Sequence, residues 1–78
     1  MVSYKIGAVI AYYATSGLMA VDLTADIHLN DLIYINNKEL KIKLIKNEYL
    51  FCDFARKGET IVINADFPVA IGDELVRT

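Results

Sequence analysis

Two side chains of this sequence could act as a general base, a nucleophile or a metal ligand, and each is the single residue of its type. His28 lies in a polar turn between Asp26 and Asp31, and catalysis there would require a partner that the sequence does not supply. Cys52 can form no internal disulfide, and no second cysteine or adjacent cation activates it. We therefore expect His28 to be an exposed turn residue, Cys52 to be a small buried one, and the protein not to be an enzyme.

The acidic residues do not form a recognisable site for a metal ion or a nucleotide. Asp22, Asp26 and Asp31 are spaced too loosely for a calcium-binding loop, and apolar residues interrupt them. The sequence also has no glycine-rich phosphate loop that ends in Gly-Lys-Ser or Gly-Lys-Thr. We expect no cofactor, no metal ion and no nucleotide.

Lysines form the strongest local basic feature of the chain. Lys41 and Lys43 point the same way on a predicted strand, and Lys38 and Lys46 extend the row. One interpretation is an RNA-backbone contact, aided by stacking on Tyr34 or Tyr49. The other is a solvated strand face whose charges prevent edge pairing, which the net charge of −2 favours. RNA binding is therefore the alternative function.

Composition predicts one folded domain that spans residues 1–78. The chain has 78 residues, 55% of them apolar, and no apolar run approaches the roughly 18–20 residues of a membrane-spanning helix. We therefore expect no membrane partner. The amino terminus lacks the pattern of a signal peptide, and a lone cysteine fits a reducing compartment, so the expected location is the cytoplasm.

Alternating apolar residues predict short β-strands over most of the chain. The clearest are residues 4–13, 18–23, 31–35 and 40–44, with a tight turn at Asn36 and Asn37, because asparagine accepts positive φ. Further strands are expected at 50–54, at 61–63 and after Gly72, although 44–54 also permits a helical turn. About six strands with frequent turns favour a small all-β barrel, and a short sandwich is the alternative.

The aromatic side chains are expected to fill the core of this barrel, because a domain of this size needs their apolar area. The residues concerned are Tyr4, Tyr12, Tyr13, Phe51 and Phe54.

Five segments in order carry a resemblance to a known family. They are IGAVIAYY at 6–13, GLMAVDLT at 17–24, LNDLIYI at 29–35, ARKGETIVI at 55–63 and PVAIGDELV at 68–76. Together they resemble the second-domain β-barrel of translation elongation factor Tu, especially its small stand-alone archaeal relatives. The resemblance implies a closed six-stranded Greek-key barrel. It also implies a non-catalytic module of the kind that contacts ribosomal RNA, a GTPase domain or aminoacyl-tRNA.

This sequence departs from that family in two ways. Asn30 stands where a glycine is expected before Asp31, and asparagine tolerates the left-handed conformation that the turn requires. Outward positions that are commonly polar in the relatives are apolar here, and an apolar patch on a small domain is typical of a docking surface. The candidate interface consists of Ala8, Ile10, Leu18, Leu32 and Tyr34. The leading hypothesis is a non-enzymatic module that docks onto a protein partner or onto a second copy, in a translation-related setting.

Overall fold

The computed structural model describes residues 3–78, which form ten β-strands and no helix. The strands are β1 (Tyr4–Tyr13), β2 (Leu18–Leu23), β3 (Ile27–His28), β4 (Leu32–Ile35), β5 (Lys38–Lys41), β6 (Ile45–Asn47), β7 (Leu50–Cys52), β8 (Phe54–Ala55), β9 (Thr60–Asn64) and β10 (Glu74–Arg77). The all-β class predicted from the alternating sequence is confirmed. The described residues include no helix of the length and apolar character that crossing a membrane requires.

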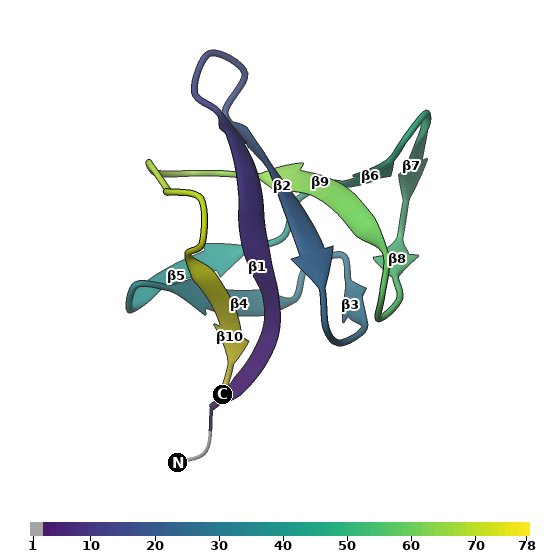
Figure 1. Ribbon diagram of the computed structural model, residues 1–78. Helices are drawn as coiled ribbons and strands as arrows, with labels where there is room; N and C mark the ends of the chain where they lie inside the picture. Colours follow the sequence, from purple (N-terminus) through teal and green to yellow (C-terminus); the bar gives the residue numbers. More distant parts are fainter. Residues whose placement is uncertain (1–2) are drawn as a thin grey trace.

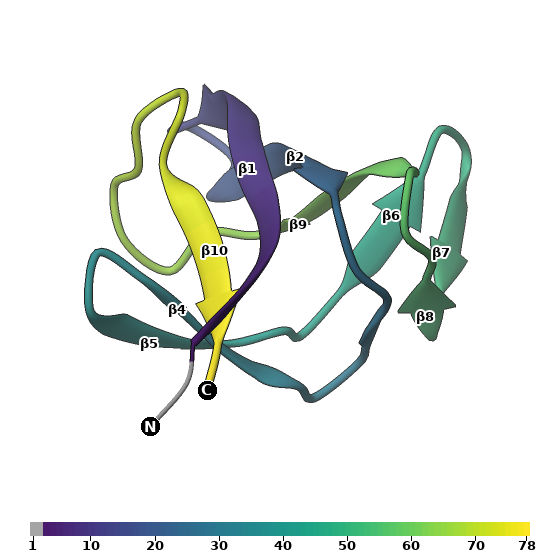
Figure 2. The same cartoon turned by 60° about the horizontal axis from the view of Figure 1, so that its bottom comes forward.

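Eight of the strands form one antiparallel sheet in the order β5-β4-β10-β1-β2-β9-β6-β7, and β3 and β8 form a second, two-stranded sheet. The large sheet curls around the core as a half-barrel (Figures 1 and 2). The closed six-stranded Greek-key barrel expected from the sequence is therefore wrong. The two end strands of the large sheet, β5 and β7, do not pair with each other, so the sheet keeps two open edges.

The tight turns that shape this sheet use the residues that the sequence indicated. Asn36 and Asn37 have φ angles of 53° and 66° in the turn between β4 and β5, which confirms the predicted hairpin. Asn30 adopts a φ of 71°, the left-handed conformation that its side chain tolerates, as the sequence predicts. Asp73 accepts a hydrogen bond from the backbone N–H of Ala70 at 2.9 Å, which closes the turn before β10.

Aliphatic side chains fill the core almost alone. The buried cluster consists of Ile6, Val9, Met19, Val21, Leu23, Ile27, Ile33, Ile35, Leu40, Ile42, Ile45, Ala55, Ile61, Ile63, Ala65 and Leu75. β-Branched isoleucine suits this position because it packs well on a pleated surface.

The aromatic core predicted from the sequence is largely wrong. Tyr12 packs against the cluster, but the other four lie outside it, with exposed fractions of 61% for Tyr4, 48% for Tyr13, 74% for Phe51 and 48% for Phe54. The physical reason is that successive residues of a strand point to opposite faces of the sheet. Aliphatic residues occupy the inward positions, so the aromatic residues point outward or lie beyond the core.

Asn64 is the buried polar residue that holds the strand ends together. It is 6% exposed at the end of β9, and its Oδ1 accepts a hydrogen bond from the Lys43 N–H at 2.7 Å. Its Nδ2 donates to the Lys41 carbonyl at 3.0 Å and to Asp66 Oδ1 at 3.0 Å. One side chain thus fixes the segment that leaves β5 against the end of β9.

We expect Asn64→Ala to lower the free energy of unfolding by about 1–3 kcal/mol, because two buried backbone groups lose their partner. Urea denaturation measures this change. Asn47→Ala, which changes a half-buried asparagine of β6, is the matched control and should cost about 0.5 kcal/mol or less. Equal losses in the two variants would contradict the role given to Asn64.

Candidate functional site

The β6–β7 hairpin carries the most exposed run of apolar residues in the described chain. Its turn residue Tyr49 is 87% exposed, and Leu50 and Phe51 of β7 are 68% and 74% exposed. β7 is also the last strand of the large sheet, so its outer side is an open edge. Figures 1 and 2 show the hairpin, with β8 beside it, projecting from one side of the half-barrel.

The local sequence explains why the hairpin projects. Ile45 at the base of β6 is fully buried and pairs with Ile63 of β9 and with Cys52 of β7. Beyond this base, Leu50 and Phe51 are both exposed, although successive strand residues point to opposite faces. Both faces of the ribbon are therefore in contact with solvent.

Glu48 stores backbone strain at the tip of this hairpin. Its φ is 28°, in a region that residues with a side chain rarely adopt, and it is neither glycine nor asparagine. A strained residue costs of order 1–3 kcal/mol and is retained where the surrounding structure or a function requires it.

Cations lie over the aromatic rings at the base of the hairpin. Lys46 Nζ is 5.8 Å from the centre of the Phe51 ring, and the Arg56 guanidinium is 5.6 Å from that of Phe54. His28 stacks on Phe54, with 6.0 Å between the ring centroids. The exposed aromatic rings are thus held in place by neighbouring side chains rather than by the core.

His28 is an exposed turn residue, as the sequence predicts. Its ring Nδ1 lies 4.0 Å from Asp31 Oδ2, which also accepts the His28 backbone N–H at 2.8 Å and pairs with Arg77 Nη2 at 3.2 Å. Asp26 accepts the Lys57 N–H at 2.7 Å. These carboxylates stabilise turns, and within residues 3–78 no group of three or more histidine, cysteine, aspartate or glutamate residues is placed to hold a metal ion.

Cys52, expected to be buried, is a half-buried free cysteine that packs against the core. Its thiol lies 3.7 Å from the Leu50 carbonyl within the same strand.

The five residues of the candidate interface all reach the surface, from β1, β2 and β4. Ile10 and Leu32 are 40% and 49% exposed, whereas Ala8, Leu18 and Tyr34 are half-buried. Ala8 pairs with Glu74 on one side and with Asp22 on the other, so charged residues flank it.

Ile10 lies in a β-bulge of β1, between Val9 and Ala11. The Gly72 N–H donates to the Val9 carbonyl at 2.8 Å, so the loop before β10 is bonded to β1 at this point. Ile71, the residue before Gly72, is 75% exposed.

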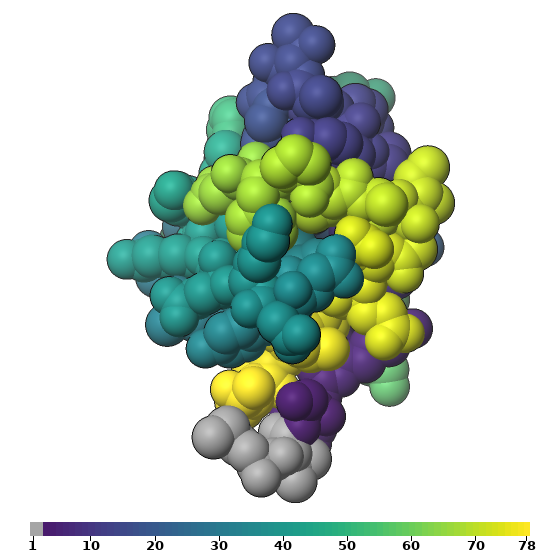
Figure 3. Space-filling view, turned by 90° about the vertical axis from the view of Figure 1, so that its left-hand side faces the viewer, coloured from purple at the N-terminus to yellow at the C-terminus, as the bar shows by residue number. Residues whose placement is uncertain are grey.

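The four candidate lysines do not form one row. Lys43 Nζ pairs with Asp66 Oδ2 at 3.1 Å, and Lys38 lies 5.3 Å from the centre of the Phe67 ring. Lys41 is opposite Leu32 on β4, and Lys46 belongs to the hairpin at the other end of the sheet. Figure 3 shows the segment that follows β9, in yellow-green, lying against the teal β4–β5 region.

Asp66 keeps its negative charge beside Lys43. The hydrogen bond from Asn64 is the main cause that lowers the pKa of Asp66, burial opposes it, and the Lys43 ammonium lowers it further. Because the folded pKa is lowered, this interaction stabilises the fold above the usual range of a carboxyl and is lost as the pH falls through that range.

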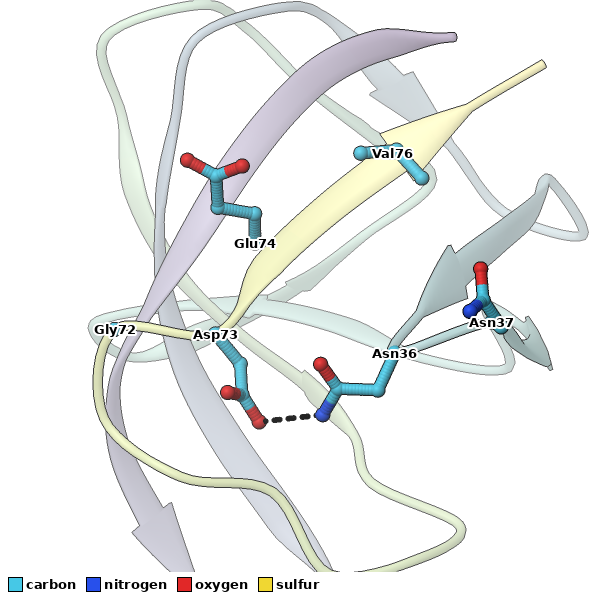
Figure 4. A pocket seen from close by; sticks show the side chains of 6 residues that line it. All are labelled: Asn36, Asn37, Gly72, Asp73, Glu74 and Val76. Atoms are coloured by element: carbon cyan, nitrogen blue, oxygen red, sulfur yellow. Dashed lines mark hydrogen bonds between the residues drawn. The ribbon is translucent and has the colours of Figure 1, made fainter.

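Two open hollows lie on the surface, and both are polar. One, of about 410 Å³, is lined by Asn47, Glu48, Glu59 and Thr60 beside the hairpin. The other, of about 340 Å³, lies between the β4–β5 turn and the start of β10 (Figure 4). In Figure 4 the Asn36 amide points toward Asp73 and donates a hydrogen bond of 3.0 Å, whereas the Glu74 carboxylate points away from this pair. These polar contacts serve the turn, and they do not converge on an enclosed space.

Solved structures define the class of this fold. Two structures of the C-terminal domain of a Geobacillus thermoleovorans "putative U32 peptidase" are similar to the chain, one of them as a selenomethionine variant. The selenomethionine structure gives a TM-score of 0.89 at 17% identity and covers 95% of this chain and 99% of that domain. The second gives 0.88 at 17% identity and covers 95% and 92%. No family model and no curated protein matches the sequence.

The resemblance to the second domain of elongation factor Tu is therefore wrong. The structural neighbours are C-terminal domains of a peptidase, and the translation-related and archaeal setting that the resemblance implied loses its basis. At 17% identity the comparison establishes the fold, which is that of the Geobacillus domain over nearly its whole length.

We expect Glu48→Gly to raise the free energy of unfolding by about 1 kcal/mol, because glycine adopts positive φ without strain. Lys57→Gly, at an exposed turn residue for which the structure gives no positive φ, is the matched control and should lower stability by a few tenths to about 1 kcal/mol. Thermal unfolding of the two variants checks the difference, and a loss of stability in Glu48→Gly would show that the turn carries no strain.

Proposed function

We propose that this chain is a non-catalytic protein-interaction domain that docks through the β6–β7 hairpin. The observation that supports this most is the run of three apolar residues, Tyr49, Leu50 and Phe51, with exposed fractions of 87%, 68% and 74% on an edge strand. Contiguous exposed apolar side chains are costly in water and are typical of interaction sites. Tyrosine in particular is enriched among the residues that dominate binding energy.

Two further observations support binding rather than catalysis. Near the hairpin, the backbone of His28 is bonded within a turn and the Arg56 guanidinium lies over the Phe54 ring. In the Geobacillus protein the same fold is a C-terminal domain, which is a part of a larger protein. We also propose a cytoplasmic location, which the free Cys52 supports.

A photo-crosslinking experiment tests the proposal. In one variant p-benzoylphenylalanine replaces Tyr49. In the control variant it replaces Tyr4, which is 61% exposed and lies on β1. In cells that express the protein, we expect crosslinked adducts with protein, a second copy included, from position 49 and few from position 4. These adducts should resist ribonuclease. Equal adducts from both positions, or adducts lost on ribonuclease treatment, would contradict docking through the hairpin.

RNA binding remains the alternative that the lysines suggested, and the structure gives it less support. Lys43 is paired with Asp66, and Lys38 and Lys46 lie over aromatic rings at separate places. Affinity for phosphates requires several cations that act together, and the net charge of the chain is −2.

Fluorescence anisotropy with a labelled single-stranded RNA measures this alternative directly. We expect no saturable binding near physiological salt. Binding that weakens steeply with added salt and is lost in Lys41→Glu would instead favour RNA as the partner, and Lys57→Glu is the control for a general loss of positive charge.

A further inference from the structure

We propose that the hairpin docks onto a second copy of this chain, by antiparallel pairing of β7 with β7 about Phe51. The proposal rests on the proposed function, because it names the partner of the same surface. It follows from the hydrogen-bonding pattern of the hairpin and from the area that the hairpin exposes.

The register of the hairpin determines which backbone groups of β7 are open. Asn47 pairs with Leu50, Lys46 with Phe51, and Ile45 with Cys52. In an antiparallel hairpin with a two-residue turn, the pair next to the turn exchanges both hydrogen bonds and the following pair exchanges none. The N–H and C=O of Phe51 therefore point away from β6, toward the open edge of the sheet.

The residue that follows β7 already has a backbone partner. The Asp53 carbonyl accepts the Leu29 N–H at 2.8 Å, next to the pairing of β3 with β8. Phe51 is thus the residue of β7 that offers both a donor and an acceptor at this edge. A two-fold axis through Phe51 would satisfy both groups twice, since each copy donates to and accepts from the other.

This symmetry fixes the remaining pairs. Leu50 of one copy lies opposite Cys52 of the second copy, in a non-hydrogen-bonded pair whose Cα atoms are about 4.5 Å apart.

The exposed area is sufficient for a weak dimer. Taking about 200 Å² for one aromatic side chain, Tyr49, Phe51 and Phe54, which are 87%, 74% and 48% exposed, offer about 400 Å² per copy. With Leu50, two copies can bury at most about 1,000 Å², which is the lower limit for a specific interface. The dimer is therefore weak and dissociates on dilution.

A disulfide between copies tests the register. Leu50→Cys keeps the native Cys52, and the two cysteines of different copies then lie within the roughly 4.4–6.8 Å of Cα separation that a disulfide needs. Mild oxidation should give a dimer on a non-reducing gel. The wild type and the double variant Leu50→Cys/Cys52→Ser each contain one cysteine and should stay monomeric, because neither places two thiols opposite each other. Crosslinking of these controls to the same extent, or none in Leu50→Cys, would overturn the register.

Sedimentation velocity tests the surface independently of the disulfide. Phe51→Lys and Ile71→Lys change residues that are 74% and 75% exposed, so they are matched in exposure, and circular dichroism checks that both fold. We expect the wild type and Ile71→Lys to change from monomer to dimer as concentration rises, and Phe51→Lys to stay monomeric.

The outcomes separate this inference from the proposed function. A wild type that remains monomeric while Tyr49 crosslinks to another protein overturns the second copy as partner and leaves docking through the hairpin intact. A dimer that Phe51→Lys preserves and Ile71→Lys abolishes moves the contact to the Ile71 surface and overturns the pairing through β7; if Tyr49 also fails to crosslink, the proposed function is overturned as well. A monomer that sediments with added single-stranded RNA or with lipid vesicles also overturns the pairing of two copies.

Discussion

The curvature of this fold follows from the short connection between β5 and β6, which the hydrogen bonds of the Asn64 side chain hold in place. The sheet order places β5 and β6 near opposite ends, yet only residues 42–44 connect them in the chain. Asn64 binds the backbone of Lys41 and Lys43 at 3.0 and 2.7 Å and so holds this connection against β9. In a flat sheet β5 and β6 would lie too far apart for residues 42–44 to connect them. This short connection therefore requires the sheet to curl.

The same constraint determines where the hairpin stands. Because the connection ends beside β9, Ile45 enters the core at once and pairs with Ile63. No layer of the described chain extends under the following residues, so Leu50 and Phe51 become exposed on both faces of the ribbon. Exposed aromatic area and the strained Glu48 both lower stability, and a small domain has little stability to lose. Their presence together favours a function for the hairpin.

Local sequence patterns predicted individual strands and turns better than they predicted whether the sheet closes into a barrel. Alternation identified the long first strand, and the Asn36–Asn37 turn followed from backbone preferences alone. Whether the ends of a sheet meet depends on contacts distant in sequence, which alternation does not encode. The sequence predicts a strand at 50–54 and leaves 44–54 ambiguous, so it misses the β6–β7 hairpin, because a ribbon exposed on both faces has no alternation to detect. The mistaken family resemblance has a related cause, since turn residues such as Gly72 and Asp73 serve many small antiparallel folds alike.

The two edges of the large sheet differ in a way that bears on function. β5 presents charged side chains at its edge, from Lys38, Glu39 and Lys41, and charged residues are how soluble proteins prevent unwanted strand pairing. β7 presents Leu50, Phe51 and the half-buried Cys52, and the nearest cation, Lys46, lies over the Phe51 ring instead of blocking the edge. The chain thus protects one edge and leaves the other apolar within the same sheet. If this fold simply tolerated exposed edges, the edges of β5 and β7 would be similar in character. The contrast between a charged and an apolar edge therefore favours pairing at β7 as a selected property of the fold.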